Sequence, residues 1–184
     1  MDKQKYLEKY FNDLRNIINF DSEKIKNLIA VSDILLKANN LGKKTMIFGN
    51  GGSAAMASHV TVDLTKTAGI RAVNFNEADL LTCFANDYGY KNWVAKALEF
   101  YADEGDLAIM ISSSGQSPNM LNGAKQAKEM KLPLVTLSGF RADNPLRTMG
   151  DVNLWVDSTA YNIVEMTHHV WLLAIIDYLI EKGS

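Results

Sequence analysis

The alternation of short apolar runs with helical segments constrains the fold of this chain more than any other feature. From residue 44 onward the apolar runs lie at 44–48, 71–75, 107–111, 133–137 and 152–156. Helical patterns lie at 53–67, 77–84, 90–102, 117–130 and 144–149, and a closing helix is expected over 160–181. This alternation predicts an α/β fold, in which a five-stranded, mostly parallel sheet, doubly wound in the flavodoxin-like manner, forms the middle of three layers.

Two helices precede the first expected strand. Apolar residues recur at three- and four-residue steps between Lys5 and Phe20, and a second periodic segment begins at Ser22, a favourable N-cap, and ends at Gly42. Such an apolar helical hairpin needs a covering surface, and a partner subunit is the simplest one. We therefore expect one domain over 1–184, with residues 1–42 serving oligomerisation and residues 43–184 forming the α/β core.

Composition excludes several classes of protein. The chain is 47% hydrophobic and 22% charged, which is typical of soluble globular proteins. Its net charge is −2 and it has no run of basic residues, so we expect no direct nucleic-acid binding. The longest apolar run, Val170–Ile176, falls well short of the ~18 residues of a membrane span, and the N-terminal segment resembles no secretion signal. With a single cysteine, the chain is expected to be cytoplasmic and without a membrane partner.

Two glycine- and serine-rich loops follow the first and third expected strands. They read GNGGS at 49–53 and SSSGQS at 112–117. In open parallel sheets, ligands bind at the carboxyl ends of the strands, where such loops lead into helices. Glycines let the backbone approach an anion, helix N-termini present unpaired N–H groups, and hydroxyls add donors without charge. Either loop alone is also an ordinary turn, but the pair indicates a phosphate site.

Neither loop matches a nucleotide fingerprint. The first lacks the third glycine of GxGxxG, and the second has no lysine after its glycine. A small phosphorylated metabolite is therefore a better candidate ligand than a mononucleotide.

Taken together, the motifs FGNGGSAAMASHV, FANDYGY, ISSSGQSPN, LVTLSGF and NIVEM resemble the sugar isomerase (SIS) domain family, and within it the phosphoheptose isomerase branch. They follow the family's order over nearly the whole chain. The resemblance implies a homotetramer built around the N-terminal helices, with active sites between subunits. It also implies that a sugar phosphate is bound by Asn50, Gly51, Ser53, Asn86, Asp87, Ser112, Ser113, Ser114 and Ser117.

The chain departs from this family at the metal-binding residues. Phosphoheptose isomerases hold zinc with a histidine and a glutamate after the first loop, and with a glutamine and a histidine eight residues apart on the closing helix. This chain keeps His59 but has Asp63 in place of the glutamate, and Val164 and Leu172 stand at the other two positions. Because His168 lies on the helical face of both replaced positions, His59, Asp63 and His168 form a candidate zinc set.

Aldose–ketose isomerisation needs a base to move a proton between adjacent carbons and an acid to serve the oxygens. Asp63 is the candidate base and His168 the candidate acid. Glu165, three residues before His168, either orients its ring or acts as the base itself. A solvated helix residue is an equal interpretation of Asp63, and a packed, hydrogen-bonded residue is an equal one of His59. Consecutive residues on a helix point about 100° apart, so only one of His168 and His169 can face the pocket.

Two functions remain open. The first is a phosphosugar isomerase acting on sedoheptulose 7-phosphate or a related sugar phosphate, in the synthesis of surface-polysaccharide precursors. The second is a non-catalytic phosphosugar-binding or protein-binding scaffold similar to the DnaA initiator-associating proteins, which keep the fold but lack the closing-helix histidine. The apolar Val164 and Leu172 favour the scaffold. A pure scaffold would not need an intact phosphate loop, however, so the enzyme is the favoured interpretation.

Overall fold

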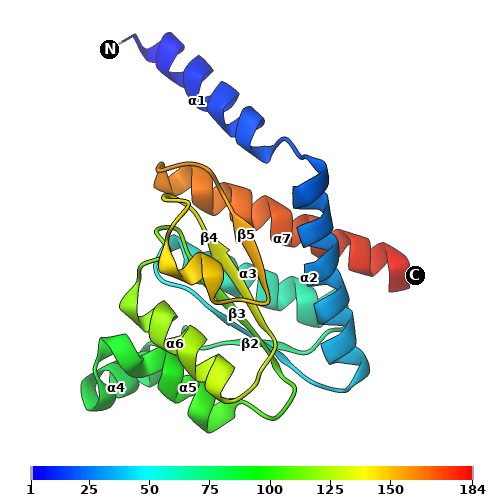
Figure 1. Cartoon of the computed structure of the whole chain (residues 1–184), viewed down its shortest axis with the longest axis vertical. Helices are drawn as coiled ribbons and strands as arrows, with labels where there is room; N and C mark the ends of the chain where they lie inside the picture. Colours follow the sequence, from blue (N-terminus) through cyan, green and yellow to red (C-terminus); the bar gives the residue numbers. More distant parts are fainter. Residues whose placement is uncertain (1, 184) are drawn as a thin grey trace.

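The computed structural model describes residues 2–183 and shows the expected alternation of strands and helices (Figure 1). The chain begins with α1 (Lys3–Ile18) and α2 (Ser22–Asn40). The strands are β1 (Thr45–Phe48), β2 (Ala72–Asn74), β3 (Leu107–Ser112), β4 (Leu134–Ser138) and β5 (Val152–Trp155). The other helices are α3 (Gly52–Lys66), α4 (Ala78–Tyr88), α5 (Trp93–Tyr101), α6 (Pro118–Glu129) and α7 (Tyr161–Gly183), with the short 3-10 helices η1 (Tyr90–Asn92) and η2 (Pro145–Thr148). The segments expected as helices at 90–102 and 144–149 thus contain these two 3-10 helices.

The five strands form one parallel sheet in the order β2-β1-β3-β4-β5. Ile47 of β1 is in register with Ile109 of β3, which in turn is in register with Val135 of β4. The chain builds the sheet outward in one direction from β1 to β2, and then in the other from β3 to β5. In such a sheet the carboxyl ends of β1 and β3 are the switch point, where ligands bind.

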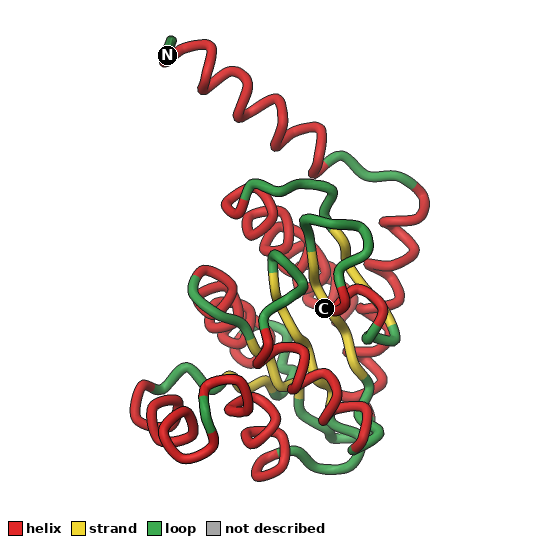
Figure 2. The backbone as a smooth tube through the Cα atoms, turned by 60° about the vertical axis from the view of Figure 1, so that its left-hand side comes forward, coloured by secondary structure: helices red, strands yellow, loops and turns green. Residues whose placement is uncertain are grey.

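Helices cover both faces of the sheet, as predicted (Figures 1 and 2). Helices α2, α3 and α7 pack on one face, through a core that includes Ile109 and Leu172. Helices α4, α5 and α6 pack on the other face, through a core that includes Met110 and Trp93. Because β1 and β3 are buried on both faces, their sequences are almost continuously apolar rather than alternating.

Helix α1 extends away from the remainder of the molecule (Figure 1). It contains no buried residue, and it exposes Tyr6, Leu7 and Phe11 by 52, 53 and 63%. Its start is nonetheless well formed, because the Asp2 side chain accepts hydrogen bonds from the first-turn N–H groups. The described residues leave this apolar face more than half exposed, and the role of the N-terminal segment in assembly stays a prediction.

Helix α7 is the closing helix and the most apolar of the long helices. By length and composition, its Tyr161–Lys182 segment could cross a membrane, but half of the most apolar window is buried inside the molecule. It packs along α2 and α3. Core packing therefore accounts for its composition.

Candidate active site

The two glycine–serine loops lie side by side, because β1 and β3 are neighbours in the sheet. A pair of amide hydrogen bonds joins the first loop to the first turn of α6, directly after the second loop. The Asn50 Nδ2 donates to Asn119 Oδ1 at 3.0 Å, and the Asn119 Nδ2 donates to Asn50 Oδ1 at 2.8 Å. The Tyr90 hydroxyl also donates to Asn50 Oδ1, at 2.9 Å. The structure thus brings the two predicted loops together and adds a third segment, η1, beside them.

The loops keep several donors unused. Neither the Gly51 N-cap of α3 nor the Ser117 N-cap of α6 forms a side-chain cap hydrogen bond. The Ser113 hydroxyl is buried and has no hydrogen-bond partner among the described residues. A buried hydroxyl without a partner is costly unless a ligand satisfies it. Two uncapped helix N-termini and an unpaired hydroxyl are the donors that a phosphate requires.

Gly115 shows how closely the second loop is held. Its φ of +65° lies in the left-handed region, and a Cβ there would meet the Asn144 Oδ1 at 1.9 Å. Its carbonyl accepts the N–H of Leu146 at 3.1 Å. Only glycine fits both the conformation and the close approach, so another residue here would disturb the loop.

A line of titratable side chains begins at these loops and follows the contact between α3 and α7. We call Glu165, His169, His59 and Asp63 the α3–α7 seam. The Glu165 carboxylate lies at the first turn of α3, since a Cβ on Gly52 would be 2.2 Å from its Oε2. One turn further along α7, the His169 Nε2 is 2.9 Å from the His59 Nδ1. The His59 Nε2 is in turn 3.2 Å from the Asp63 Oδ2.

Electrostatics tune two members of the seam. Burial raises the pKa of Glu165 above its usual value, which favours a carboxylate that can exchange protons nearer neutral pH. Burial, and then the neighbouring His59, lower the pKa of His169, although Asp63 opposes this shift. At the His59–His169 contact one ring nitrogen must donate and the other accept, so this contact carries one proton.

His168 does not belong to this line, which corrects its expected place beside His59 and Asp63. It is completely buried, and its Nε2 donates to the Ser138 carbonyl at 3.0 Å. Burial lowers the pKa of His168 to about 4, so the ring is neutral at physiological pH. Val164 and Leu172, one turn away on either side, are buried with it. Val164, His168 and Leu172 therefore lie on the face of α7 that points into the core. Glu165 and His169, each one residue later in the sequence, lie on the face that meets α3.

The predicted Asn86–Asp87 pair lies at the end of α4, exposed to solvent. The Asn86 Nδ2 donates to the Asp87 Oδ1 at 2.8 Å, and Asp87 also accepts from the Cys83 thiol at 3.7 Å. Its contact with the sugar stays a prediction. Tyr90, three residues later, is the member of this segment that reaches the first loop.

A comparison with protein families assigns the chain. Residues 9–139 match the model of the SIS domain. The chain belongs to the SIS domain family. The matched segment contains both loops but ends before α7, so it does not include the part of the seam that carries Glu165 and His169.

Curated relatives of this SIS protein extend the match to nearly the whole chain. It is 35% identical over 175 residues to the probable phosphoheptose isomerase of Thermoplasma acidophilum, covering 91% of this chain and 92% of the relative. It is 33% identical to the phosphoheptose isomerase of Fusobacterium nucleatum, covering 91% and 88%. The phosphoheptose isomerase structure from Neisseria gonorrhoeae superposes with a TM-score of 0.85 at 25% identity, covering 96% of this chain and 97% of that one. The phosphoheptose isomerase branch predicted from the motifs is confirmed.

The zinc set that the SIS resemblance implies does not fit the side chains of this chain. Both ring nitrogens of His59 already face protein partners, and His168 points into the core. Val164 and Leu172 are buried apolar residues. Within residues 2–183, no group of three or more His, Cys, Asp and Glu side chains is arranged to hold a metal ion. We therefore derive no catalytic step through zinc.

Sequence reasoning missed two residues of this SIS site. Tyr90 and Asn119 lie within the recognised motifs FANDYGY and ISSSGQSPN, but no spacing rule marks them, because they act on another loop. On the closing helix, the ligand positions that the resemblance implies favour His168, whereas the structure places His169 on the seam. The packing of α7 against α3 decides this point, and helical periodicity alone does not.

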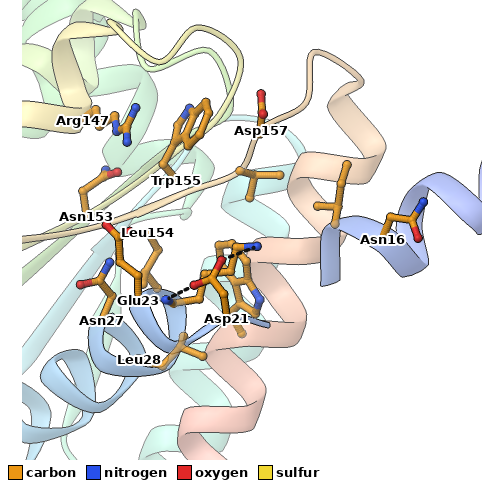
Figure 3. A pocket seen from close by; sticks show the side chains of 14 residues that line it. Asn16, Asp21, Glu23, Asn27, Leu28, Arg147, Asn153, Leu154, Trp155 and Asp157 are labelled. Carbon is orange, nitrogen blue, oxygen red and sulfur yellow. Dashed lines mark hydrogen bonds and ion pairs between the residues drawn. The ribbon is translucent and has the colours of Figure 1, made fainter. Parts of the chain in front are cut away.

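A separate cavity of about 560 Å³ lies at the β5 edge of the sheet, between β5 and the start of α2 (Figure 3). The Arg147 guanidinium covers the Trp155 ring, 4.2 Å from its centroid. Lys24 and Asp21, which also line the cavity, form an ion pair of 3.3 Å. No predicted site residue lines this cavity. We place the active site at the loops because the unused donors are there.

Proposed function

We propose that this SIS protein is an aldose–ketose isomerase of phosphorylated sugars, with sedoheptulose 7-phosphate as the first substrate to test. The observation that carries the proposal is the continuity of the site: the unused phosphate donors at two loops lead directly into the α3–α7 seam. Its curated relatives are named phosphoheptose isomerases. We further propose that it works in the cytoplasm.

The loops would bind the phosphate group and so fix one end of the sugar. Ser113 supplies a hydroxyl without an internal partner, and the first turns of α3 and α6 supply backbone N–H groups. Ser112 donates to Ser117 at 3.0 Å, which leaves the Ser117 hydroxyl hydrogen free to turn toward a ligand. Ser53 is buried at the start of α3. Since all these donors are neutral, the helix N-termini supply the positive potential.

The seam would perform the proton transfers. Isomerisation takes a proton from C1 of the ketose, passes through an enediol, and returns a proton to C2, while a second group moves a proton between the two oxygens. Glu165 is the candidate carbon base, because its carboxylate lies at the start of α3 and has a raised pKa. His59 and His169 share a hydrogen bond and serve the oxygens. Asp63 orients His59 rather than acting as the base.

Nuclear magnetic resonance of sedoheptulose 7-phosphate tests this proposal. We expect new aldose signals and, in heavy water, deuterium at C2 of the product. The rate should survive a chelator, because no step depends on zinc. Unphosphorylated sedoheptulose is the control, and it should turn over far more slowly. The absence of turnover for several ketose phosphates, with and without added zinc, would refute the isomerase.

The non-catalytic alternative is favoured by one specific observation: Val164 and Leu172 are buried in the core, at the two positions where the family resemblance implies polar metal ligands. A phosphosugar-binding scaffold needs the loops but not the seam. Calorimetric binding of sedoheptulose 7-phosphate without any conversion would support this alternative.

We also propose that the chain assembles into a homotetramer through α1. Its Tyr6, Leu7 and Phe11 form an apolar face that the described part of the chain leaves more than half exposed. Light scattering coupled to gel filtration tests this, and a variant carrying Leu7→Glu and Phe11→Glu should yield smaller particles.

A further inference from the structure

We propose that Asn119 and Tyr90 are positioning residues that hold Asn50 and thereby fix the two phosphate loops relative to each other. We call Asn50, Asn119 and Tyr90 the amide clamp. The inference deepens the proposed function and rests on the phosphate site described above. It assigns a role to two side chains that need not touch the substrate.

The clamp uses nearly all the hydrogen-bonding capacity of the Asn50 amide. Its Oδ1 accepts from both Asn119 Nδ2 and the Tyr90 hydroxyl, which fills both lone pairs. Its Nδ2 donates to Asn119 Oδ1. A side chain bonded at three points has one orientation, so the amide cannot rotate freely. Three separate segments, the first loop, α6 and η1, are therefore tied at one group.

Asn119 acts from within the protein. It is only 2% exposed and lies in the first turn of α6, directly after the second loop. Its reciprocal bonds with Asn50 reach the first loop, whose own strand is β1. Because the two loops come from different strands, their separation is set by contacts between them and not by local sequence. A phosphate held by donors on both loops needs that separation to be fixed before it binds.

Asn122 provides a matched control on the same helix. One turn further along α6, its Nδ2 donates to the Lys91 carbonyl at 2.9 Å and to Asn92 Oδ1 at 3.0 Å. It therefore ties α6 to η1 without touching Asn50. Replacing Asn122 removes a similar amide bridge between the same elements, and it leaves the clamp intact.

The experiment measures the dissociation constant of sedoheptulose 7-phosphate by calorimetry, together with kcat and KM, for the full chain, three single variants and one double variant. Asn119→Ala keeps its backbone N–H at the helix start and should raise Kd and KM about tenfold while kcat changes by less than about threefold. Tyr90→Phe removes one hydroxyl and should raise Kd about threefold. Asn122→Ala should leave Kd within about twofold of the parent chain. In the double variant of Asn119 and Tyr90, the rise in Kd should be smaller than the product of the two single rises, because both residues act through Asn50.

Two results would overturn the clamp. Unchanged Kd in Asn119→Ala and Tyr90→Phe would show that the loops need no such tie. An equal rise in Kd in Asn119→Ala and Asn122→Ala would show that the α6–η1 contact has only a general packing role. If Asn119→Ala fails to fold, Tyr90→Phe carries the test alone, since its side chain is half exposed.

A measurement without ligand separates the clamp from the isomerase. Amide hydrogen exchange of residues 49–53 should accelerate in Asn119→Ala and not in Asn122→Ala. A parent chain that binds the sugar phosphate but does not convert it refutes the isomerase and leaves the clamp standing. A parent chain that isomerises, with unaltered exchange and affinity in Asn119→Ala, refutes the clamp and leaves the isomerase standing.

Discussion

The two faces of α7 carry side chains of similar chemistry in opposite environments. His168 is fully buried, donates to the Ser138 carbonyl and has a pKa near 4. His169, the next residue, is half-buried and meets His59 across the seam. Glu165 lies on the seam face, and Leu172 on the core face. One face of the helix holds the fold together, and the other is available for chemistry.

The largest expected effect comes from the seam face. Glu165→Gln removes the candidate carbon base without changing its size, and kcat should fall on the order of 100- to 1000-fold. The affinity for sedoheptulose 7-phosphate should stay within about threefold, because the phosphate donors remain. Glu181→Gln, an exposed carboxylate on the same helix, is the matched control and should behave as the parent chain. An unchanged kcat in Glu165→Gln would remove Glu165 from the mechanism.

The core face should not tolerate a histidine, the residue that the family resemblance implies at position 172. Leu172 is 2% exposed, so Leu172→His places an imidazole among apolar neighbours and should cost about 3 kcal/mol of unfolding free energy. The adjacent Leu173 is only partly buried, and Leu173→His should cost less than about 1 kcal/mol. Urea denaturation measures both values. A stable Leu172→His variant that binds zinc would show that this face can turn toward the site.

The buried histidine should also make stability depend on pH. The pKa of His168 is about 4 in the folded protein against 6.5 for a free histidine, so the unfolded chain binds more protons between these values. The contribution of His168 to the free energy of unfolding is therefore fully present above pH 6.5. It falls by up to about 3 kcal/mol as the pH drops toward 4.

His168→Leu isolates that contribution. The Ser138 carbonyl keeps the N–H of Val156 as a donor at 2.9 Å, so the variant should lie within about 1.5 kcal/mol of the parent chain at pH 7.5. At pH 4.5 it should be the more stable of the two. If the free energy of unfolding changed with pH in the same way for the variant and the parent chain, a neutral, buried His168 would be contradicted.

The sequence was sufficient for the sheet and for the position of the phosphate loops. Apolar runs and their spacing mark five buried strands, and the loops are local features of glycine and serine at strand ends. The parallel order then brings 49–53 and 112–117 together, because the carboxyl ends of adjacent parallel strands share one edge.

The seam could not be predicted in the same way. Periodicity gives the angle between His168 and His169, but it does not give the rotation of α7 about its own axis. That rotation is set by the packing of Val164 and Leu172 into the core. Likewise, the clamp joins Asn50 to residues 40 and 69 positions away, and no local pattern records such a contact.

The smallest expected effect tests whether His169 works through His59. His169→Gln removes one ring of a hydrogen-bonded pair, and kcat should fall about tenfold, less than the 100-fold typical of losing a general acid or base, because His59 remains with Asp63. His59→Gln should have the larger effect. If the two rings act as one unit, the double variant should be no slower than His59→Gln alone. Losses of kcat that multiply fully in the double variant would mean that each histidine contacts the sugar independently. His168→Leu is the control on the core face, and its kcat at pH 7.5 should equal that of the parent chain.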